Sequence, residues 1–434
     1  MKMTKPPRAL RKPNRLRRSR VVVFPLIGAL LLFGGPAIGF ALGDRATPID
    51  NRPLAAFPSI SEGWKFLPKF QAWANDYLPL RAQAVRANAE ISQALFGEAP
   101  RFATGGASVG VAGVGTNTPT TGSTAKPSNG VKYPPVLTGK DGWLFYGSDV
   151  EAPCKPQESM ATIMKGFQTL SDAATKSGRK IVIVIAPDKS SAHPELMPDS
   201  YAGKACMAKQ KIAFWKAAST LTGLTLLDPK PALASFEKQS GRPAWRKLDT
   251  HWAPEGAAIF ATELAKALQP SLLDSTTVSP GPVEQSPGDL AAILGNPRSE
   301  PVVTANIDRP GVQLRSNGKS ITPAETPDLG YSPITVTAKS TSAQLYEPRT
   351  MLLGDSFFEA SRAELAPFFR SLSYVHNMSG DVPGENATLA AQVATSDTVV
   401  YELVERAAVG GYVSYQHPAN FNALATAMLE HPRN

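Results

Sequence analysis

Two short segments, 248–252 and 352–357, contain side chains that could perform nucleophilic catalysis. The first offers Asp249 and His251, and the second offers Ser356. A serine hydroxyl is a weak nucleophile until a histidine accepts its proton, and a carboxylate that fixes the histidine tautomer improves this base. We therefore predict that Ser356 is a nucleophile, that His251 is its general base and that Asp249 orients the histidine.

Each segment also has a purely structural interpretation. Gly-Asp-Ser after a strand is a common turn sequence, and Asp249 could cap a helix that begins at Pro254. Asp355 is better explained as a turn and capping residue than as the acid of a triad. His376, at the end of another expected strand, is the second choice for the base. We favour catalysis because both segments fall at strand–helix junctions of one sheet.

The elements that must position these residues alternate between strands and helices. The sequence predicts strands over 180–186, 224–227, 350–353, 373–376 and 398–403, and helices over 160–176, 207–221, 254–268, 358–370 and 387–394. This alternation predicts an α/β fold with a parallel sheet covered by helices on both faces. Ser356 follows a strand end, where open α/β sheets bind ligands, and amides at the following helix start could stabilise an oxyanion.

A stretch rich in proline and glycine, 280–348, interrupts the alternation. Its short alternating pieces predict an irregular, β-rich insertion that could form a wall of the site.

The net charge of +9 arises at the amino terminus. Residues 1–20 carry nine basic and no acidic side chains, which leaves 36 basic and 36 acidic side chains in the remainder. This distribution argues against nucleic-acid binding. The uncharged apolar segment 21–43 is long enough to cross a bilayer, and the positive charges before it orient the amino terminus toward the cytoplasm.

We therefore expect a basic cytoplasmic tail over 1–20, a single-pass signal-anchor over 21–43 and a catalytic domain on the outer side of the inner membrane. A signal peptide cleaved near 41–43 is the alternative. Aromatic residues at helical spacing predict a helical stalk over 44–100, and Gly, Ser, Thr and Pro predict a linker over 101–130. The compact domain then covers 131–434.

The chain has only two cysteines, Cys154 and Cys206, and both lie in the part expected to be exported. An oxidising compartment favours a single disulfide between them. The five histidines are scattered and lack the paired spacing of zinc ligands, so we expect no metal. No cofactor is expected either.

Five segments occur in a fixed order: 139–146, 186–189 with 194–195, 249–257, 354–357 and 402–406. Their residues resemble the alginate O-acetyltransferase family, whose members are exported, membrane-anchored proteins of the SGNH/GDSL hydrolase-like superfamily. The resemblance implies a circularly permuted SGNH-hydrolase-like fold in which Ser356 receives an acetyl group and passes it to a hydroxyl of an extracytoplasmic polysaccharide. It also implies a membrane-bound O-acyltransferase partner that supplies the acetyl group.

Four residues are candidates for substrate contact. The aromatic rings of Trp143, Tyr146 and Trp252 could stack on sugars, although such rings are more often core residues. Lys189 could steer an acidic polymer or could be a solvated loop lysine.

Two other functions remain open at this point. The same triad with water as acceptor would make a carbohydrate acetyl esterase. A vestigial triad would leave a non-catalytic, glycan-binding assembly subunit.

Overall fold

The computed structural model describes residues 59, 66, 69, 133–382 and 385–433. The expected tail, anchor and linker, and almost all of the expected stalk, lie outside the described residues. No helix in the described ranges combines the length and apolar character needed to cross a bilayer. The chain separates into two compact units, Met1–Phe102 and Ala103–Asn434, and the fold below is that of the second.

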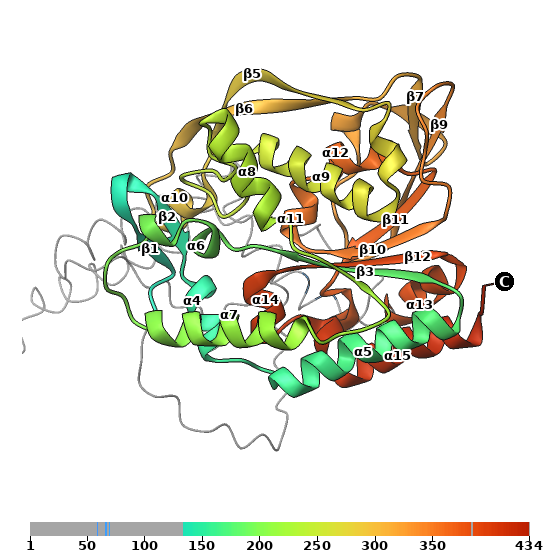
Figure 1. The fold of residues 1–434 in the computed structure, drawn as a ribbon, viewed down its shortest axis with the longest axis horizontal. Helices are drawn as coiled ribbons and strands as arrows, with labels where there is room; N and C mark the ends of the chain where they lie inside the picture. Colours follow the sequence, from blue (N-terminus) through green and yellow to red (C-terminus); the bar gives the residue numbers. More distant parts are fainter. Residues whose placement is uncertain (1–58, 60–65, 67–68, 70–132, 383–384, 434) are drawn as a thin grey trace, which may run out of the picture. The chain divides into compact units, whose positions relative to one another are not determined.

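An eight-stranded sheet forms the centre of this unit, in the order β4-β3-β12-β10-β11-β9-β7-β8 (Figure 1). Its first five strands are mutually parallel: β4 (Thr225–Leu227), β3 (Lys180–Ala186), β12 (Thr398–Val404), β10 (Thr350–Gly354) and β11 (Ser371–His376). Every residue of β10 and β12 is buried, as expected for strands covered on both faces. The predicted parallel arrangement is confirmed for these five strands, and their carboxyl ends lie at one edge.

Helices cover both faces of the sheet (Figure 1). One layer contains α4 (Ser148–Cys154), α5 (Met160–Lys176), α7 (Lys204–Ala218), α13 (Glu385–Thr395), α14 (Glu405–Gly410) and α15 (Pro418–Glu430). The other contains α8 (Lys230–Ser240), α9 (Pro254–Leu268), α11 (Ser356–Glu359) and α12 (Arg362–Leu365). Helices α5 and α9 begin and end where the sequence predicts.

The single helix predicted over 358–370 is wrong. The chain instead forms α11, α12 and a 3-10 turn, Ala366–Phe368. Ser361 has non-helical backbone angles between the two helices, and its hydroxyl donates to the carbonyl oxygen of Phe357. Pro367 has no N–H to continue the hydrogen-bond ladder. The spacing of apolar residues alone does not predict the breaks at Ser361 and Pro367.

The insertion is rich in strands, as predicted, but part of it extends the main sheet. Strand β9 (Ile334–Ser340) pairs antiparallel with β11, and β7 (Val312–Ser316) and β8 (Lys319–Ile321) follow. The sheet is therefore mixed rather than wholly parallel. Strands β5 (Thr277–Pro287) and β6 (Ser299–Asp308) form a separate antiparallel ribbon, and α10 (Asp289–Ile293) lies between them in sequence.

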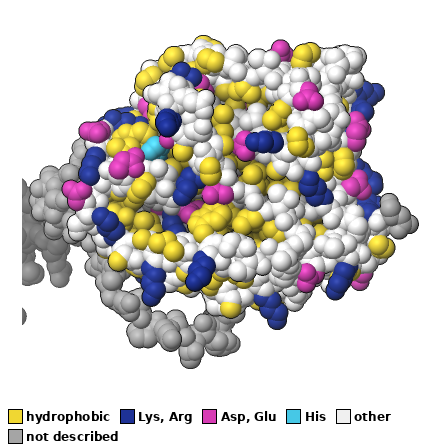
Figure 2. All heavy atoms as spheres, viewed as in Figure 1, with side chains coloured by type: hydrophobic (Ala, Val, Ile, Leu, Met, Phe, Trp, Pro, Cys, Tyr) yellow, Lys and Arg dark blue, Asp and Glu magenta, His cyan; other side chains and the backbone are white. Residues whose placement is uncertain are grey.

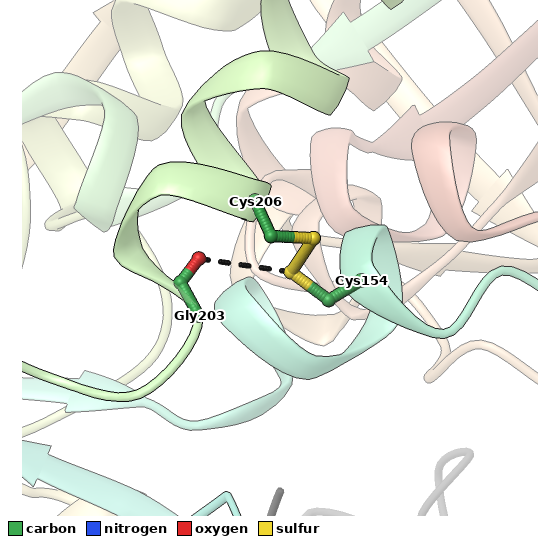
Figure 3. The surroundings of a disulfide bond; sticks show 3 residues. All are labelled: Cys154, Gly203 and Cys206. Atoms are coloured by element: carbon green, nitrogen blue, oxygen red, sulfur yellow. Dashed lines mark hydrogen bonds between the residues drawn. A yellow bond between two sulfur atoms is a disulfide. The ribbon is translucent and has the colours of Figure 1, made fainter. Parts of the chain in front are cut away.

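Short elements surround the carboxyl edge of the sheet. They include the antiparallel pair β1 (Val136–Thr138) and β2 (Leu144–Tyr146), and α6 (Lys189–Ala192). A disulfide joins Cys154, the last residue of α4, to Cys206 near the start of α7 (Figure 3). The bond therefore fixes one end of α7 beside the helix that follows β2.

Basic and acidic side chains are interspersed over the face drawn in Figure 2. This spread agrees with the equal numbers of basic and acidic side chains beyond residue 20.

Candidate active site

Ser356 is the first residue of α11 and directly follows the end of β10 and Asp355. The carboxylate of Asp355 accepts hydrogen bonds from the backbone N–H of Phe357 and of Val404, both at 2.8 Å. Asp355 therefore caps the turn, as the sequence suggests, and fixes it to the end of β12. The serine itself is half-buried.

Asp249 and His251 lie on a buried loop before α9. The imidazole Nδ1 of His251 lies 2.8 Å from Oδ1 of Asp249, and the backbone N–H of His251 donates to the same oxygen at 2.9 Å. The loop is therefore bent, which lets side chains two residues apart meet. Nε2 of His251 is buried and has no hydrogen-bond partner among the described residues. The ring lies 5.1 Å, between centroids, from that of Phe357, the neighbour of Ser356.

The charges in this loop favour a positive imidazole. Burial alone would lower the pKa of His251, but the hydrogen bond and charge of Asp249, followed by the charge of Asp289, raise it above its ordinary value. Burial would raise the pKa of Asp249, but the hydrogen bond and charge of His251 and the charge of Arg246 hold it well below its usual range. Asp249 is therefore a carboxylate at neutral pH and can stabilise an imidazolium.

Three side chains from other elements hold the backbone of this loop. Nζ of Lys189 donates to the carbonyl oxygens of Arg246 and Asp249 at 2.9 and 2.5 Å. Glu300 of β6 accepts from the N–H of Lys247 and of Leu248 at 2.7 and 2.8 Å. Asp289 of α10 accepts from the N–H of Thr250 at 2.7 Å.

A metal ion could be considered where Asp249, His251 and Asp289 meet, because one potential ligand atom from each lies within 4.8 Å of the others. Their oxygens are already engaged, however, since Asp249 accepts from His251 and from the N–H of Asp289. Arg246 also places a guanidinium nitrogen 3.1 Å from Oδ2 of Asp249. The chemistry of this set therefore fits the orientation of an imidazole better than the coordination of a cation.

Two of the predicted substrate contacts need correction. Trp252 is 2% exposed, stacks on Phe260 and meets Phe357 edge to face, so its ring belongs to the core beneath the site. Lys189 is also 2% exposed, and its ammonium faces the carbonyl oxygens of the Asp249 loop rather than solvent. Burial lowers the pKa of Lys189 to about 8. Neither sequence interpretation of Lys189 foresaw this position.

Trp143 and Tyr146 are only partly buried and lie near the carboxyl edge. Trp143 lies 5.1 Å, between ring centroids, from His193, and its ring is 5.7 Å from Nζ of Lys189. The guanidinium of Arg406 lies 5.1 Å from the centre of the Tyr146 ring. Contact of these two aromatic rings with substrate stays a prediction.

His376, the alternative base, ends β11 and stacks on Tyr331. Its Nδ1 accepts a hydrogen bond from the N–H of Met378 at 3.1 Å, and burial lowers its pKa. Since Nδ1 accepts from an amide rather than facing a carboxylate, His376 lacks the support that His251 has. His251 therefore remains the better candidate for the base.

The sequence interpretation missed the roles of several buried charges. Arg406 places Nη1 2.9 Å from Asp188, and its guanidinium lies 5.6 Å from the centre of the Phe357 ring. Lys211 lies between Asp188 and Glu405, at 2.6 and 3.0 Å. Most of these residues lie in segments 186–189 and 402–406, which are two of the five segments that resemble the family. Their place in those segments was the one sequence feature that could have pointed to these buried charges. Asp289 had no comparable signal because it lies in the irregular insertion.

A sheet layered between helices, with a serine, a buried histidine and a carboxylate at its carboxyl edge, defines the class of serine-hydrolase-like α/β proteins. The chain belongs to the family described as "SGNH hydrolase-like domain, acetyltransferase AlgX", whose model matches residues 136–398. The predicted family and SGNH-like fold are thereby confirmed.

Curated relatives carry a related name. The "Probable alginate O-acetylase AlgJ" of Pseudomonas syringae pv. tomato is 31% identical over 136 residues, which is 31% of this chain and 34% of the relative. The protein of the same name from Pseudomonas aeruginosa is 28% identical over 145 residues, 32% of this chain and 35% of the relative. The matches therefore span about a third of the length of these relatives.

Two solved structures are similar to this chain over most of their own length. The O-acetyltransferase domain of Pseudomonas putida AlgJ aligns with 67% of this chain and 99% of that chain, with 17% identity and a TM-score of 0.44. Bacillus cereus PatB1 aligns with 63% of this chain and 96% of that chain, with 14% identity and a TM-score of 0.41.

Proposed function

We propose that this chain is an O-acetyltransferase that carries an acetyl group on Ser356. The observation that supports this most directly is the state of His251. Its Nδ1 is bound to Asp249, while its Nε2 is buried beside α11 and has no hydrogen-bond partner within the part of the chain that the structure describes. An imidazole whose Nδ1 is held by a carboxylate can accept the proton of a serine hydroxyl at its Nε2.

The first half of the reaction loads the serine. Nε2 of His251 takes the hydroxyl proton as Oγ of Ser356 bonds to the acetyl carbonyl carbon. The tetrahedral intermediate then collapses, and the bond between the acetyl carbon and the donor breaks as the imidazolium returns its proton to the leaving group. Asp249 stabilises the imidazolium throughout.

The second half of the reaction transfers the acetyl group from Ser356 to the acceptor. His251 takes the proton of an acceptor hydroxyl, whose oxygen bonds to the acetyl carbon, and Oγ of Ser356 leaves and regains the proton. A held acceptor can outcompete water because positioning gives it a high effective concentration. We assign the acceptor to an extracytoplasmic polysaccharide, of the alginate type or another exopolysaccharide or cell-wall glycan, on the strength of family membership.

The remaining parts of the proposal concern location and supply. The expected anchor over 21–43 would place this domain on the outer side of the inner membrane. Acetyl-CoA is cytoplasmic, so the acetyl group would have to reach Ser356 through a membrane-bound O-acyltransferase. The residues in the scheme require no cofactor of their own.

The decisive experiment follows the fate of the acetyl group. The full-length chain is incubated with an activated acetyl ester and an acidic oligosaccharide, and acetylated sugar and free acetate are quantified by mass spectrometry. Ser356→Ala tests the nucleophile, and Ser320→Ala, at an exposed position on β8, is the matched control. We expect acetylated sugar from the wild type and the control but not from Ser356→Ala.

Other outcomes would redirect the proposal. Free acetate alone, formed only when Ser356 is present, would identify an esterase. The absence of any Ser356-dependent turnover, with neither acetylated sugar nor free acetate formed above the level of Ser356→Ala, would favour the non-catalytic, glycan-binding subunit.

A further inference from the structure

The carboxylate of Asp289, which the scheme above does not use, lies against the loop that carries Asp249 and His251. Oδ1 of Asp289 accepts from the N–H of Thr250 at 2.7 Å, and the N–H of Asp289 donates to Oδ2 of Asp249 at 3.1 Å. The other oxygen of Asp289, Oδ2, is 3.8 Å from Nδ1 of His251. Two carboxylates from separate segments therefore face one imidazole nitrogen.

The insertion fixes Asp289 in this place. Its side chain is only 15% exposed. The next two residues, Leu290 and Ala291, are fully buried and pack with Leu248, and the N–H of Ala291 donates to the carbonyl oxygen of Leu248 at 3.3 Å. A Cβ at Gly288 would lie 2.4 Å from that oxygen, so only glycine permits this approach. Asp289 is thus held by packing on both sides of its own backbone.

The groups that face His251 come from four elements. Asp249 shares its loop, Asp289 comes from α10, the ring of Phe357 comes from α11, and the charge of Arg406 comes from α14. The two carboxylates raise the pKa of His251, whereas burial and Arg406 lower it. Burial and the charge of Asp249 raise the pKa of Asp289 itself. An imidazolium at His251 would therefore interact with both carboxylates.

We propose that Asp289 is a positioning residue of the active site, a second carboxylate that holds the Asp249 loop and stabilises the imidazolium formed when His251 takes the serine proton. Its part in turnover rests on the proposed acetyl transfer. Its contacts with the loop and its charge beside His251 are properties of the folded chain. The insertion is then part of the catalytic apparatus and does more than wall the site.

Asp289→Asn tests this charge with little change of shape. The amide oxygen can still accept from the N–H of Thr250, while the negative charge is removed. The matched control is Asp308→Asn, at an exposed position at the far end of β6. The full-length chain, labelled with ¹³C in the histidine rings, is titrated by NMR, and the His251 resonance is assigned by its loss in His251→Gln.

We expect the pKa of His251 to fall by about one unit in Asp289→Asn and to stay unchanged in Asp308→Asn. The acid limb of the kcat profile for acetyl transfer should move to lower pH by the same amount, with KM little changed. A merely structural role would not move this limb.

An unchanged His251 pKa in folded Asp289→Asn would overturn the proposal. The titration does not depend on activity, so a wild-type chain without Ser356-dependent turnover would refute the proposed function and still leave the charge of Asp289 testable. If Asp289→Asn does not fold, Asp289→Ser retains an acceptor for the loop without the charge and is titrated in the same way.

Discussion

Glu402 is fully buried in β12, directly beneath the turn that presents Ser356. Its Oε2 accepts from the N–H of Asp355 at 2.8 Å. Burial and the charge of Asp355 raise the pKa of Glu402 well above its ordinary value. We therefore expect this side chain to be a neutral acid in the folded protein while it ionises in the unfolded chain, and Glu402→Gln should mimic the folded state closely.

The size of the effect follows from proton linkage. Between the ordinary carboxyl pKa and the folded pKa of Glu402, the folded chain holds one proton that the unfolded chain has lost, so the stability of the wild type falls as pH rises. One proton corresponds to about 1.4 kcal/mol per pH unit. Glu402→Gln has no proton to lose, so its stability should gain on that of the wild type by this amount per unit.

The assay is urea unfolding of the wild type and Glu402→Gln at several pH values from about 5 to 7. Glu325→Gln, at an exposed position, is the control: the hydrogen bonds from the backbone N–H and the hydroxyl of Thr322 lower the pKa of Glu325, so Glu325 does not titrate in that range. Its difference from the wild type should be constant. A constant difference for Glu402→Gln as well would show that Glu402 is ionised in the folded state and would refute the reasoning.

Two further predictions concern the support of the site. Lys189→Met removes the donor from the carbonyl oxygens of Arg246 and Asp249 and should lower the free energy of unfolding by about 3 kcal/mol. In denaturant titrations the control Lys209→Met, at an exposed position, should match the wild type. An unchanged free energy of unfolding in Lys189→Met would contradict the role assigned to Lys189. The double variant Cys154→Ser, Cys206→Ser opens a loop with a sequence separation of 52 and should lose about 4 kcal/mol. Calorimetry under oxidising conditions measures the loss. If this variant melts at the same temperature as the wild type, the disulfide does not stabilise the fold.

The positions of Ser356, Asp249 and His251 could be predicted because they depend on local signals. A buried strand followed by a helix places Ser356 at the carboxyl edge of the sheet, and a bent Asp-x-His loop brings its two side chains together. The long apolar runs of β3 and β12 predict a sheet that is covered on both faces. These features need only the order of residues within one element or its junction.

The features that escaped prediction depend on contacts between distant segments. Asp289 reaches His251 only because the insertion folds back on the loop. Strand β9 joins the sheet through antiparallel pairing with β11, which periodicity within either segment does not reveal. The side chain of a lysine or tryptophan next to Asp249, His251 or Ser356 can face solvent or the interior. Neighbouring elements pack over Lys189 and Trp252 and bury both side chains.

The central claim, that Ser356 carries the acetyl group, is tested most directly by intact-mass analysis of the full-length chain after brief exposure to an activated acetyl ester, followed by peptide mapping. The account predicts one rapidly formed acetyl adduct that maps to Ser356, is absent from Ser356→Ala and forms much more slowly in His251→Gln. An adduct that forms equally well in Ser356→Ala, or that maps to another residue, would contradict it.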